Sequence, residues 1–224
     1  MGRKTFVKRD LREMPAYSIA EAAGYLRLPK STLRAWLLGQ SSFRPVIEIA
    51  DKKGRQLSFI NLVEAFVLSS IRRGHKVSLP KVRKSVDYLR RTFKTPRPLA
   101  DEQFETDGVN LFVEKFGALV GVSEEGQMHL RELIRDRLKN VRRDPSGVPE
   151  KIVLFPAHGA AAKGDVIIDP RLSFGRPVLD GVGVRTSILA ERFQTGDTIE
   201  ELAREYSAAP EAIQNAIRCE RRAA

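Results

Sequence analysis

Apolar residues recur at helical spacing in two short stretches close to the beginning of the chain. The first stretch follows Ser18, and its apolar side chains are Ile19, Ala22, Ala23 and Leu26. Ser18 and Glu21 have the spacing of a capping box, which is typical of a helix start. A Leu-Pro pair breaks the pattern, and a second helix is expected from Lys30 to Gly39, where a glycine ends it. The pattern predicts a helix-turn-helix over residues 17–39.

Two apolar runs after this unit predict a β-hairpin. Strands are expected at 46–49 and 56–59, joined by a turn in which Gly54 is the residue best suited to positive φ. A strongly apolar helix is then expected over 61–72. The order helix, turn, helix, hairpin, helix is that of a winged helix-turn-helix, which we assign to a first domain over residues 1–76.

Three further units are expected beyond that domain. A basic connecting helix over 77–99 has one apolar face and ends at a Pro-Arg-Pro stretch. A small central α+β unit follows over 100–156, and a C-terminal helical domain lies over 165–224. Residues 157–164, which are rich in Ala and Gly, are expected to be a linker. The fold class predicted for the whole chain is therefore mainly α, of the α+β type.

The last two units can be divided further by their local signals. The central unit is expected to hold strands near Phe104 and over 109–113, 118–122 and 152–155, with a helix over 126–141. Asp107-Gly108 is expected to form a tight turn. The C-terminal domain is expected to hold a strand over 166–168 and three helices, over 186–194, 199–206 and 210–221. Thr198 and Glu201 have the spacing of a second capping box, and the helices resemble a second helix-turn-helix.

The charge of the chain is unevenly distributed. The 224 residues carry a net charge of +11, but residues 1–100 hold 22 Lys and Arg against 7 Asp and Glu. The remaining residues hold 17 against 21, so the two parts carry net charges of +15 and −4. A strongly basic segment attracts polyanions, of which nucleic acid is the commonest. The charge therefore favours the N-terminal helix-turn-helix as the DNA-binding unit.

The second helix-turn-helix candidate has the opposite charge balance. Residues 195–218 contain five acidic side chains against two arginines, which favours a folding or protein-contact role. Gln214 and Asn215 could read adenine, however, and three basic residues lie at the end of the last helix, namely Arg218, Arg221 and Arg222. A second DNA-reading role for this unit therefore stays open.

The candidate DNA contacts lie around the second helix and on the hairpin. In the usual docking mode, the beginning of the second helix enters the major groove, while the wing contacts the flanking backbone. The residues expected to contact DNA are Arg27, Lys30, Ser31, Thr32, Arg34, Lys52, Lys53 and Arg55. Arginine can form a bidentate pair with guanine, whereas Ser, Thr and Lys reach phosphates or bases. One short helix reads few bases, so a homodimer on two half-sites is expected. The apolar faces of 82–93 and 130–138 are either the dimer surfaces or part of the ordinary core of one chain.

Residues that could support catalysis or metal binding are sparse. The single cysteine, Cys219, excludes internal disulfides and cysteine-rich zinc sites, and it suits the reducing cytoplasm. The three histidines, His75, His129 and His158, have no partner at metal-ligand spacing. No apolar run approaches the roughly 18 residues that a membrane helix needs. We therefore expect no enzymatic activity, no cofactor and no membrane partner.

Two stretches carry a resemblance to known families. YSIAEAAGYLRLPKSTLRAW, with the later SFINLVEAF, resembles the MerR-type helix-turn-helix and is nearer still to the DNA-binding domain of VapB-like antitoxins. The C-terminal stretch resembles a small helical antitoxin-type domain of originally unknown function. The residues that carry this second resemblance are Ile168-Asp169-Pro170, Gly175-Arg176-Pro177-Val178, Gly181, Val184 and the helix start at 196–202. Gly183-Val184-Arg185 departs from the threonine-arginine arrangement that is commoner before the first helix of that domain.

The resemblance implies an antitoxin of a type II toxin–antitoxin pair. Such a protein would neutralise a PIN-like ribonuclease and repress its own operon. One alternative is a MerR-like regulator that binds a small molecule in the central unit, where Phe104, Phe112 and Phe116 could line a pocket. Another is an RNA- or ribosome-associated protein, although few aromatic residues lie on the basic face for stacking on bases.

Overall fold

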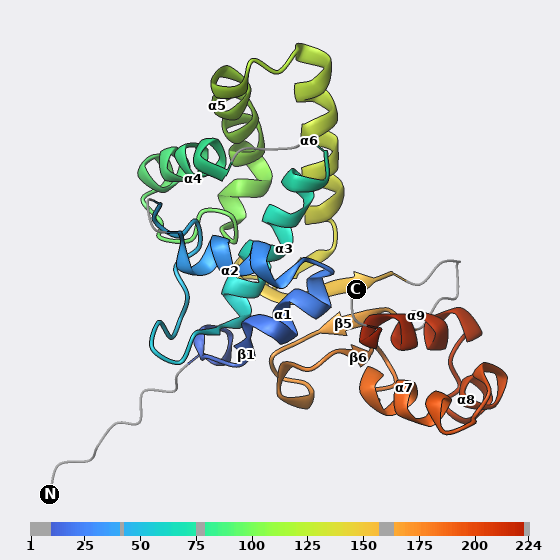
Figure 1. Cartoon of the computed structure of the whole chain (residues 1–224). Helices are drawn as coiled ribbons and strands as arrows, with labels where there is room; N and C mark the ends of the chain where they lie inside the picture. Colours follow the sequence, from blue (N-terminus) through green and yellow to red (C-terminus); the bar gives the residue numbers. More distant parts are fainter. Residues whose placement is uncertain (1–9, 41–42, 75–78, 157–163, 222–224) are drawn as a thin grey trace, which may run out of the picture.

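The computed structural model describes residues 10–40, 43–74, 79–156 and 164–221 (Figure 1). Most of these residues are helical, and a four-stranded sheet lies between the large helical body and a small group of C-terminal helices. The predicted class, mainly α of the α+β type, is confirmed.

The N-terminal helices follow the prediction closely. After a short 3-10 turn, η1 (Leu11–Glu13), helix α1 (Ile19–Leu26) begins at Ser18, whose side chain accepts from the Glu21 amide while the Glu21 side chain accepts from the Ser18 amide. Helix α2 (Lys30–Leu38) ends at Gly39, and α3 (Phe59–Gly74) follows. The helix-turn-helix and its capping box are therefore confirmed.

The hairpin predicted after α2 is wrong. Residues 46–49 form no strand, because the amides of Val46 and Ile47 donate to the Trp36 carbonyl at the end of α2, at 2.8 and 3.1 Å. The Asn61 side chain binds the backbone at Glu48 and Ala50, which fixes this segment against α3 without a strand partner. Strand β2 (Gln56–Leu57) pairs instead with β1 (Tyr17–Ser18), which precedes α1.

The strands predicted near Phe104 and over 109–113 and 118–122 are also wrong, because this segment is helical. Helix α4 (Leu79–Phe93) is followed by a π-helical turn, η2 (Phe104–Gly108), and then by α5 (Val109–Val120) and α6 (Glu124–Leu138). Asp107-Gly108, the predicted tight turn, lies inside η2. A Cβ at Gly108 would lie 2.8 Å from the Phe104 ring and 2.9 Å from the Phe93 ring, so close packing requires this glycine.

One antiparallel sheet joins the central and C-terminal segments. Its strands occur in chain order, namely β3 (Val141–Arg143), β4 (Pro149–Phe155), β5 (Val166–Ile168) and β6 (Val178–Leu179). The pairing of β4 with β5 crosses the predicted linker, most of which lies outside the described residues. A 3-10 turn, η3 (Ser173–Gly175), lies between β5 and β6.

The three C-terminal helices lie where the sequence predicts them. They are α7 (Thr186–Gln194), α8 (Ile199–Glu205) and α9 (Pro210–Glu220), and the Thr198–Glu201 capping box starts α8. Together with β5 and β6 they form a group that we call the C-terminal unit, whose own core contains Leu189, Leu202 and Ile213.

A larger core extends from Tyr17 to Ile168 and unites the N-terminal and central segments. It includes the apolar faces that are candidate dimer surfaces, since Val82, Val86 and Leu89 of α4 are buried, as are Leu130, Ile134 and Leu138 of α6. These faces pack inside one chain, so they are not available for a dimer.

Candidate nucleic-acid interface

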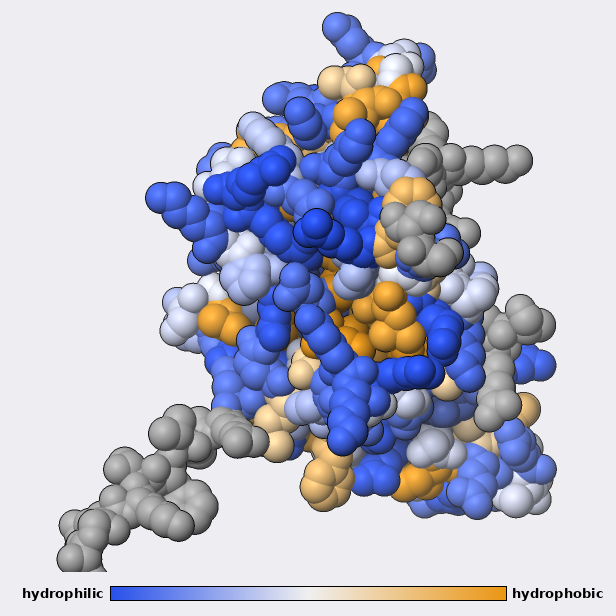
Figure 2. All heavy atoms as spheres, turned by 60° about the vertical axis from the view of Figure 1, so that its left-hand side comes forward, coloured by the Kyte–Doolittle hydropathy of each residue, from blue (hydrophilic) through white to orange (hydrophobic). Residues whose placement is uncertain are grey.

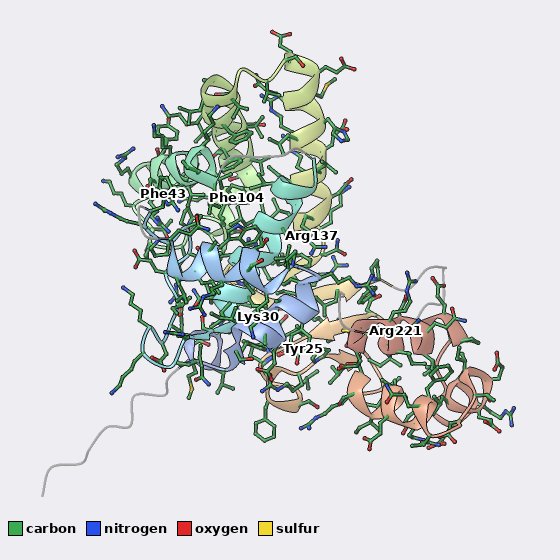
Figure 3. The ribbon with its side chains drawn as sticks, viewed as in Figure 1. Tyr25, Lys30, Phe43, Phe104, Arg137 and Arg221 are labelled. Atoms are coloured by element: carbon green, nitrogen blue, oxygen red, sulfur yellow. The ribbon has the colours of Figure 1, made fainter. Side chains whose placement is uncertain are left out.

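The beginning of α2 presents a basic, exposed surface. Lys30 (Figure 3), Ser31 and Arg34 are exposed. The opposite face of the helix buries Leu33 and Trp36 against the core. Among the described residues, no side chain caps this helix start, and its first turn contains no acidic residue. Free amides and the positive end of the helix dipole therefore face outward with Lys30, an arrangement that suits a phosphate.

Thr32, a fourth predicted contact, faces the interior. Its exposed fraction is 7%, so its side chain packs with the core of the helix-turn-helix rather than at the surface. The exposed positions 30, 31 and 34 follow the helical period, and position 32 falls on the opposite side. We therefore leave Thr32 out of the DNA-contact set.

Arg27, at the turn between α1 and α2, contacts another part of the molecule. It has left-handed backbone angles, with φ at 53°, and its Nη2 donates to the Arg218 carbonyl of α9 at 3.0 Å. Its guanidinium also lies 4.6 Å from the centroid of the Phe155 ring. The residue is exposed, but its contacts hold the C-terminal unit against the helix-turn-helix.

The three remaining predicted contacts lie together on the loop between Asp51 and Gln56. These two residues form an antiparallel bridge, and the Asp51 carboxylate accepts from the amides of Lys53 and Gly54, each at 2.9 Å. Lys52, Lys53 and Arg55 are exposed on it. The positive φ predicted for Gly54 occurs at Arg55 instead, at 54°. Gly54 is needed for a different reason, since a Cβ at this position would lie 2.4 Å from the Asp51 carboxylate. The loop is thus a compact basic projection even without the predicted hairpin.

Basic residues continue onto α4. Lys84 and Arg91 are exposed on this helix, and the Arg83 guanidinium lies 5.3 Å from the centroid of the Phe43 ring. Seen from the side of α4 and of the loop after Asp51, the surface is mostly hydrophilic around an apolar patch (Figure 2). Basic side chains of residues 1–100, the part of the chain with a net charge of +15, are therefore exposed on α2, on the loop after Asp51 and on α4.

The aromatic residues of the central unit do not form a ligand pocket. Phe104, Phe112 and Phe116 are fully buried, and successive ring centroids lie 6.4 and 5.8 Å apart. Packing therefore explains them, and they give no support to the small-molecule alternative.

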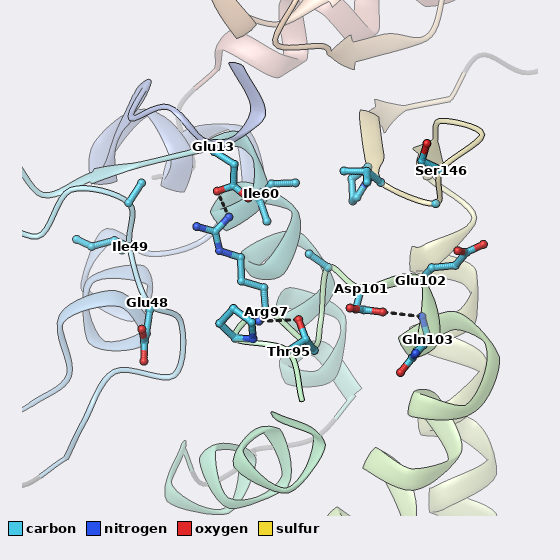
Figure 4. A pocket seen from close by; sticks show the side chains of 16 residues that line it. Glu13, Glu48, Ile49, Ile60, Thr95, Arg97, Asp101, Glu102, Gln103 and Ser146 are labelled. Carbon is cyan, nitrogen blue, oxygen red and sulfur yellow. Dashed lines mark hydrogen bonds and ion pairs between the residues drawn. The ribbon is translucent and has the colours of Figure 1, made fainter. Parts of the chain in front are cut away.

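A different cleft, of about 700 Å³, lies between η1, residues 48–50 and the segments 95–103 and 146–149 (Figure 4). Its charged side chains are mostly acidic, namely Glu13, Glu48, Asp101 and Glu102 against Arg97, and Arg97 is ion-paired with Glu13. A cleft of this charge does not suit DNA, because its carboxylates would repel phosphates.

Within the described residues, no group of three or more His, Cys, Asp or Glu is placed to hold a metal ion. Cys219 is buried, and burial raises the pKa of its thiol to about 12. Among the residues that the structure describes, no helix is both long and apolar enough to cross a membrane.

The C-terminal unit contacts α1 at a second place, where η3 meets the beginning of that helix. Arg176 Nη1 lies 2.8 Å from the Glu21 carboxylate, and its guanidinium lies over the Tyr17 ring. A Cβ at Gly175 would lie 2.3 Å from the Tyr17 hydroxyl. Together with Arg27, these contacts place the C-terminal unit directly beside the helix-turn-helix.

Both the segment that contains the helix-turn-helix and the C-terminal unit are similar to known families. Residues 15–86 match a family model described as "Putative DNA-binding HTH domain", and residues 166–218 match one described as "Protein of unknown function (DUF433)". The chain is 28% identical to "Putative antitoxin VapB45" of Mycobacterium tuberculosis, over 92% of this chain and 93% of the relative. The resemblance to VapB-like antitoxins with an N-terminal helix-turn-helix is confirmed.

The similarity extends to the fold. The crystal structure of Rv2018 from Mycobacterium tuberculosis superposes with a TM-score of 0.72, at 28% identity, and the match covers 91% of this chain and 98% of that one. Both family matches therefore lie within one shared architecture rather than in two independent modules.

Proposed function

We propose that this protein is an antitoxin that binds operator DNA, neutralises a PIN-like ribonuclease and represses its own operon. The observation that carries the proposal is the exposed basic beginning of α2, inside the segment that matches a DNA-binding family. The similarity of 92% of the chain to a protein named as an antitoxin supports the toxin-neutralising part. This role is regulatory and needs no enzymatic activity, and the buried Cys219 fits a cytoplasmic protein.

For DNA binding, we propose that α2 enters the major groove with its first turn. Lys30 and Ser31 would bind phosphates with the free amides of the helix start, and Arg34 would reach a base edge. The loop residues Lys52, Lys53 and Arg55 would contact the flanking backbone. Neutralising about six phosphates gives a log–log salt dependence with a slope near −5.

A homodimer would double this small contact set. Two copies of α2 spaced one helical turn apart could read two half-sites, which is how short recognition helices obtain specificity. Since the apolar faces of α4 and α6 are core, the dimer contact must use other surfaces.

For toxin binding, we propose the acidic end of the C-terminal unit, which we define by its exposed carboxylates Glu191, Glu200, Glu201, Glu205 and Glu211. A ribonuclease that binds RNA presents a basic groove, so an acidic surface complements it. The Arg192 side chain is held within this end by ion pairs with Asp197 and Glu205. The surface therefore keeps a net negative charge.

The DNA-binding part can be tested by a mobility shift with the region upstream of the gene. Replacing Lys30 and Arg34 by alanine should weaken binding about thirtyfold or more, at roughly 1 kcal/mol or more per contact. The matched control removes Arg135 and Lys139, two exposed basic residues near the end of α6, and should bind like the parent. Unchanged affinity in the Lys30/Arg34 variant would contradict this assignment of the interface.

The toxin-binding part can be tested with the product of the adjacent reading frame. Co-expression should give a stable complex that co-purifies, and it should restore growth that the partner alone inhibits. Charge reversal of Glu205 and Glu211 to lysine should weaken the complex without affecting DNA binding. Failure of the two full-length proteins to associate would refute the antitoxin proposal.

A further inference from the structure

The C-terminal unit has two ends of opposite charge. Helices α7 and α9 pack against each other with the beginning of α7 beside the end of α9, where the Thr186 hydroxyl donates to the Glu220 carboxylate. This shared end is basic, and its arginines are Arg176, Arg185, Arg218 and Arg221. The acidic end lies at the opposite side of the unit, where α9 begins.

It is the basic end that lies against the helix-turn-helix. Helix α9 contacts α1, and its last residues point toward the turn between α1 and α2 (Figure 1). The bond from Arg27 to the Arg218 carbonyl fixes this arrangement. Lys30, the first residue of α2, is three residues beyond Arg27, so their Cα atoms are at most about 11 Å apart. The end of α9 therefore lies beside the turn that leads into the recognition helix.

Two arginines at this end have side chains free for a ligand. Arg218 and Arg221 are exposed, and neither forms an ion pair within the described part of the chain. Since Arg27 binds the backbone of Arg218, the Arg218 guanidinium is not used in that contact. The nearest acid in the chain, Glu220, is engaged by Thr186. The two guanidiniums thus outweigh the partial negative charge of about −0.5 at the helix end.

We propose that Arg218 and Arg221 bind DNA phosphates beside the groove that α2 enters. The DNA interface is then formed by both segments that match a family model, residues 15–86 and 166–218. This inference rests on the proposed DNA binding by α2. The Arg27 side chain spans the distance from the turn before α2 to the Arg218 carbonyl. The major groove is about 12 Å wide, so side chains beside this turn can meet the phosphates that border the groove. The sequence contains two separate DNA-reading candidates, and the structure merges the basic parts of both into one surface.

The salt dependence of binding tests the proposal. Fluorescence anisotropy with a short labelled duplex from the upstream region gives the dissociation constant of the full chain across a range of salt concentrations. Replacing Arg218 and Arg221 by alanine should reduce the magnitude of the log–log slope by about 1.8, since each lost phosphate contact contributes about 0.9. Alanine at position 218 leaves the carbonyl that Arg27 binds in place, so the fold should be unchanged.

Two further variants separate charge from structure. Replacing Arg204 and Arg135, exposed arginines on α8 and α6, removes the same charge elsewhere and should leave the slope unchanged. Lysine at 218 and 221 keeps the point charge and should keep the slope. If the lysine variant loses as much slope as the alanine variant, charge is not the cause and the inference is overturned.

The outcomes also separate this inference from the proposed function. If the parent chain does not bind the duplex, or binds it regardless of Lys30 and Arg34, the proposed interface on α2 fails. If binding depends on Lys30 and Arg34 while the alanine variant of Arg218 and Arg221 keeps the full slope, only the shared interface is refuted.

Discussion

Glu64 lies on α3 inside the N-terminal core, and replacing it with glutamine should stabilise the protein near neutral pH. Its exposed fraction is 1%, and one carboxylate oxygen receives only a long contact, 3.4 Å, from the Asn61 amide nitrogen. The other oxygen has no hydrogen-bond partner among the described residues. Burial raises the pKa of this carboxyl to about 8, and the Asn61 contact and the charges of Arg97 and Arg90 only partly oppose it.

The sign of the pH effect follows from this raised pKa. In the unfolded chain the carboxyl loses its proton near pH 4.5, whereas in the folded chain it keeps the proton to about pH 8. Between these values the folded state binds more protons, so the free energy of unfolding falls as the pH rises. One pH unit corresponds to about 1.4 kcal/mol. Raising the pH from about 6 to about 7.5 should therefore lower the free energy of unfolding by about 2 kcal/mol.

Urea denaturation at several pH values measures this effect. Trp36 is the single tryptophan and is 2% exposed, so its fluorescence reports unfolding of the same core. Glu64→Gln is neutral at every pH and should remove the fall of about 2 kcal/mol. Glu48→Gln, at an exposed position, should keep the parent slope. If Glu64→Gln and the parent lose stability in parallel as the pH rises, the burial argument is wrong.

Two further changes test the packing and capping of α1. Gly175→Ala should destabilise the protein by roughly 2–3 kcal/mol, because φ is +74° and the new Cβ would lie 2.3 Å from the buried Tyr17 hydroxyl. Gly181 is the control, because its φ is +77° and a Cβ there would have no atom within 4 Å. Gly181→Ala should therefore lower the free energy of unfolding by only about 1 kcal/mol, the backbone cost alone. Equal losses of stability in the two variants would disprove the steric part of the argument. Ser18→Ala removes a bond to the Glu21 amide and should lower the free energy of unfolding by about 1 kcal/mol, whereas an unchanged midpoint in urea would show that the capping box contributes nothing.

Features set by local chemistry could be predicted from the sequence. A capping side chain binds an amide only three residues away, so Ser18 and Thr198 mark helix starts whatever the rest of the chain does. Glycine and proline act equally locally, and the end of α2 at Gly39 and the start of α9 at Pro210 follow from them. The C-terminal helices are therefore predicted almost to the residue.

The central unit shows where local signals mislead. The buried residues of α5 have helical spacing, at positions 109, 112, 113, 116 and 117, but apolar residues between them hide the period. Asp107-Gly108 is typical of a turn, yet Gly108 is helical because the rings of Phe93 and Phe104 pack against it. The Phe104 ring belongs to the same turn, but the Phe93 ring comes from the end of α4, and that tertiary contact has no local signal in the sequence.

The candidate site shows the same division. Helical period alone separates the exposed Lys30, Ser31 and Arg34 from the core of the helix-turn-helix, and it also places Thr32 inside. The contact of Arg27 with α9 joins residues 191 positions apart, which no local pattern indicates. The neighbours of the recognition helix therefore became visible only in the fold.

The sheet has a consequence for how such proteins can be divided and recombined. The C-terminal family match begins at Val166, the first residue of β5, although β5 pairs on one side with β4, which lies outside the match. The unit of sequence homology therefore cuts through the unit of folding. A copy of the C-terminal segment that lacked residues 149–155 would expose the backbone groups of β5 as an open edge, which is prone to pair with other chains. Transfer of that segment alone to another protein would therefore leave this edge to be paired or covered by the new host.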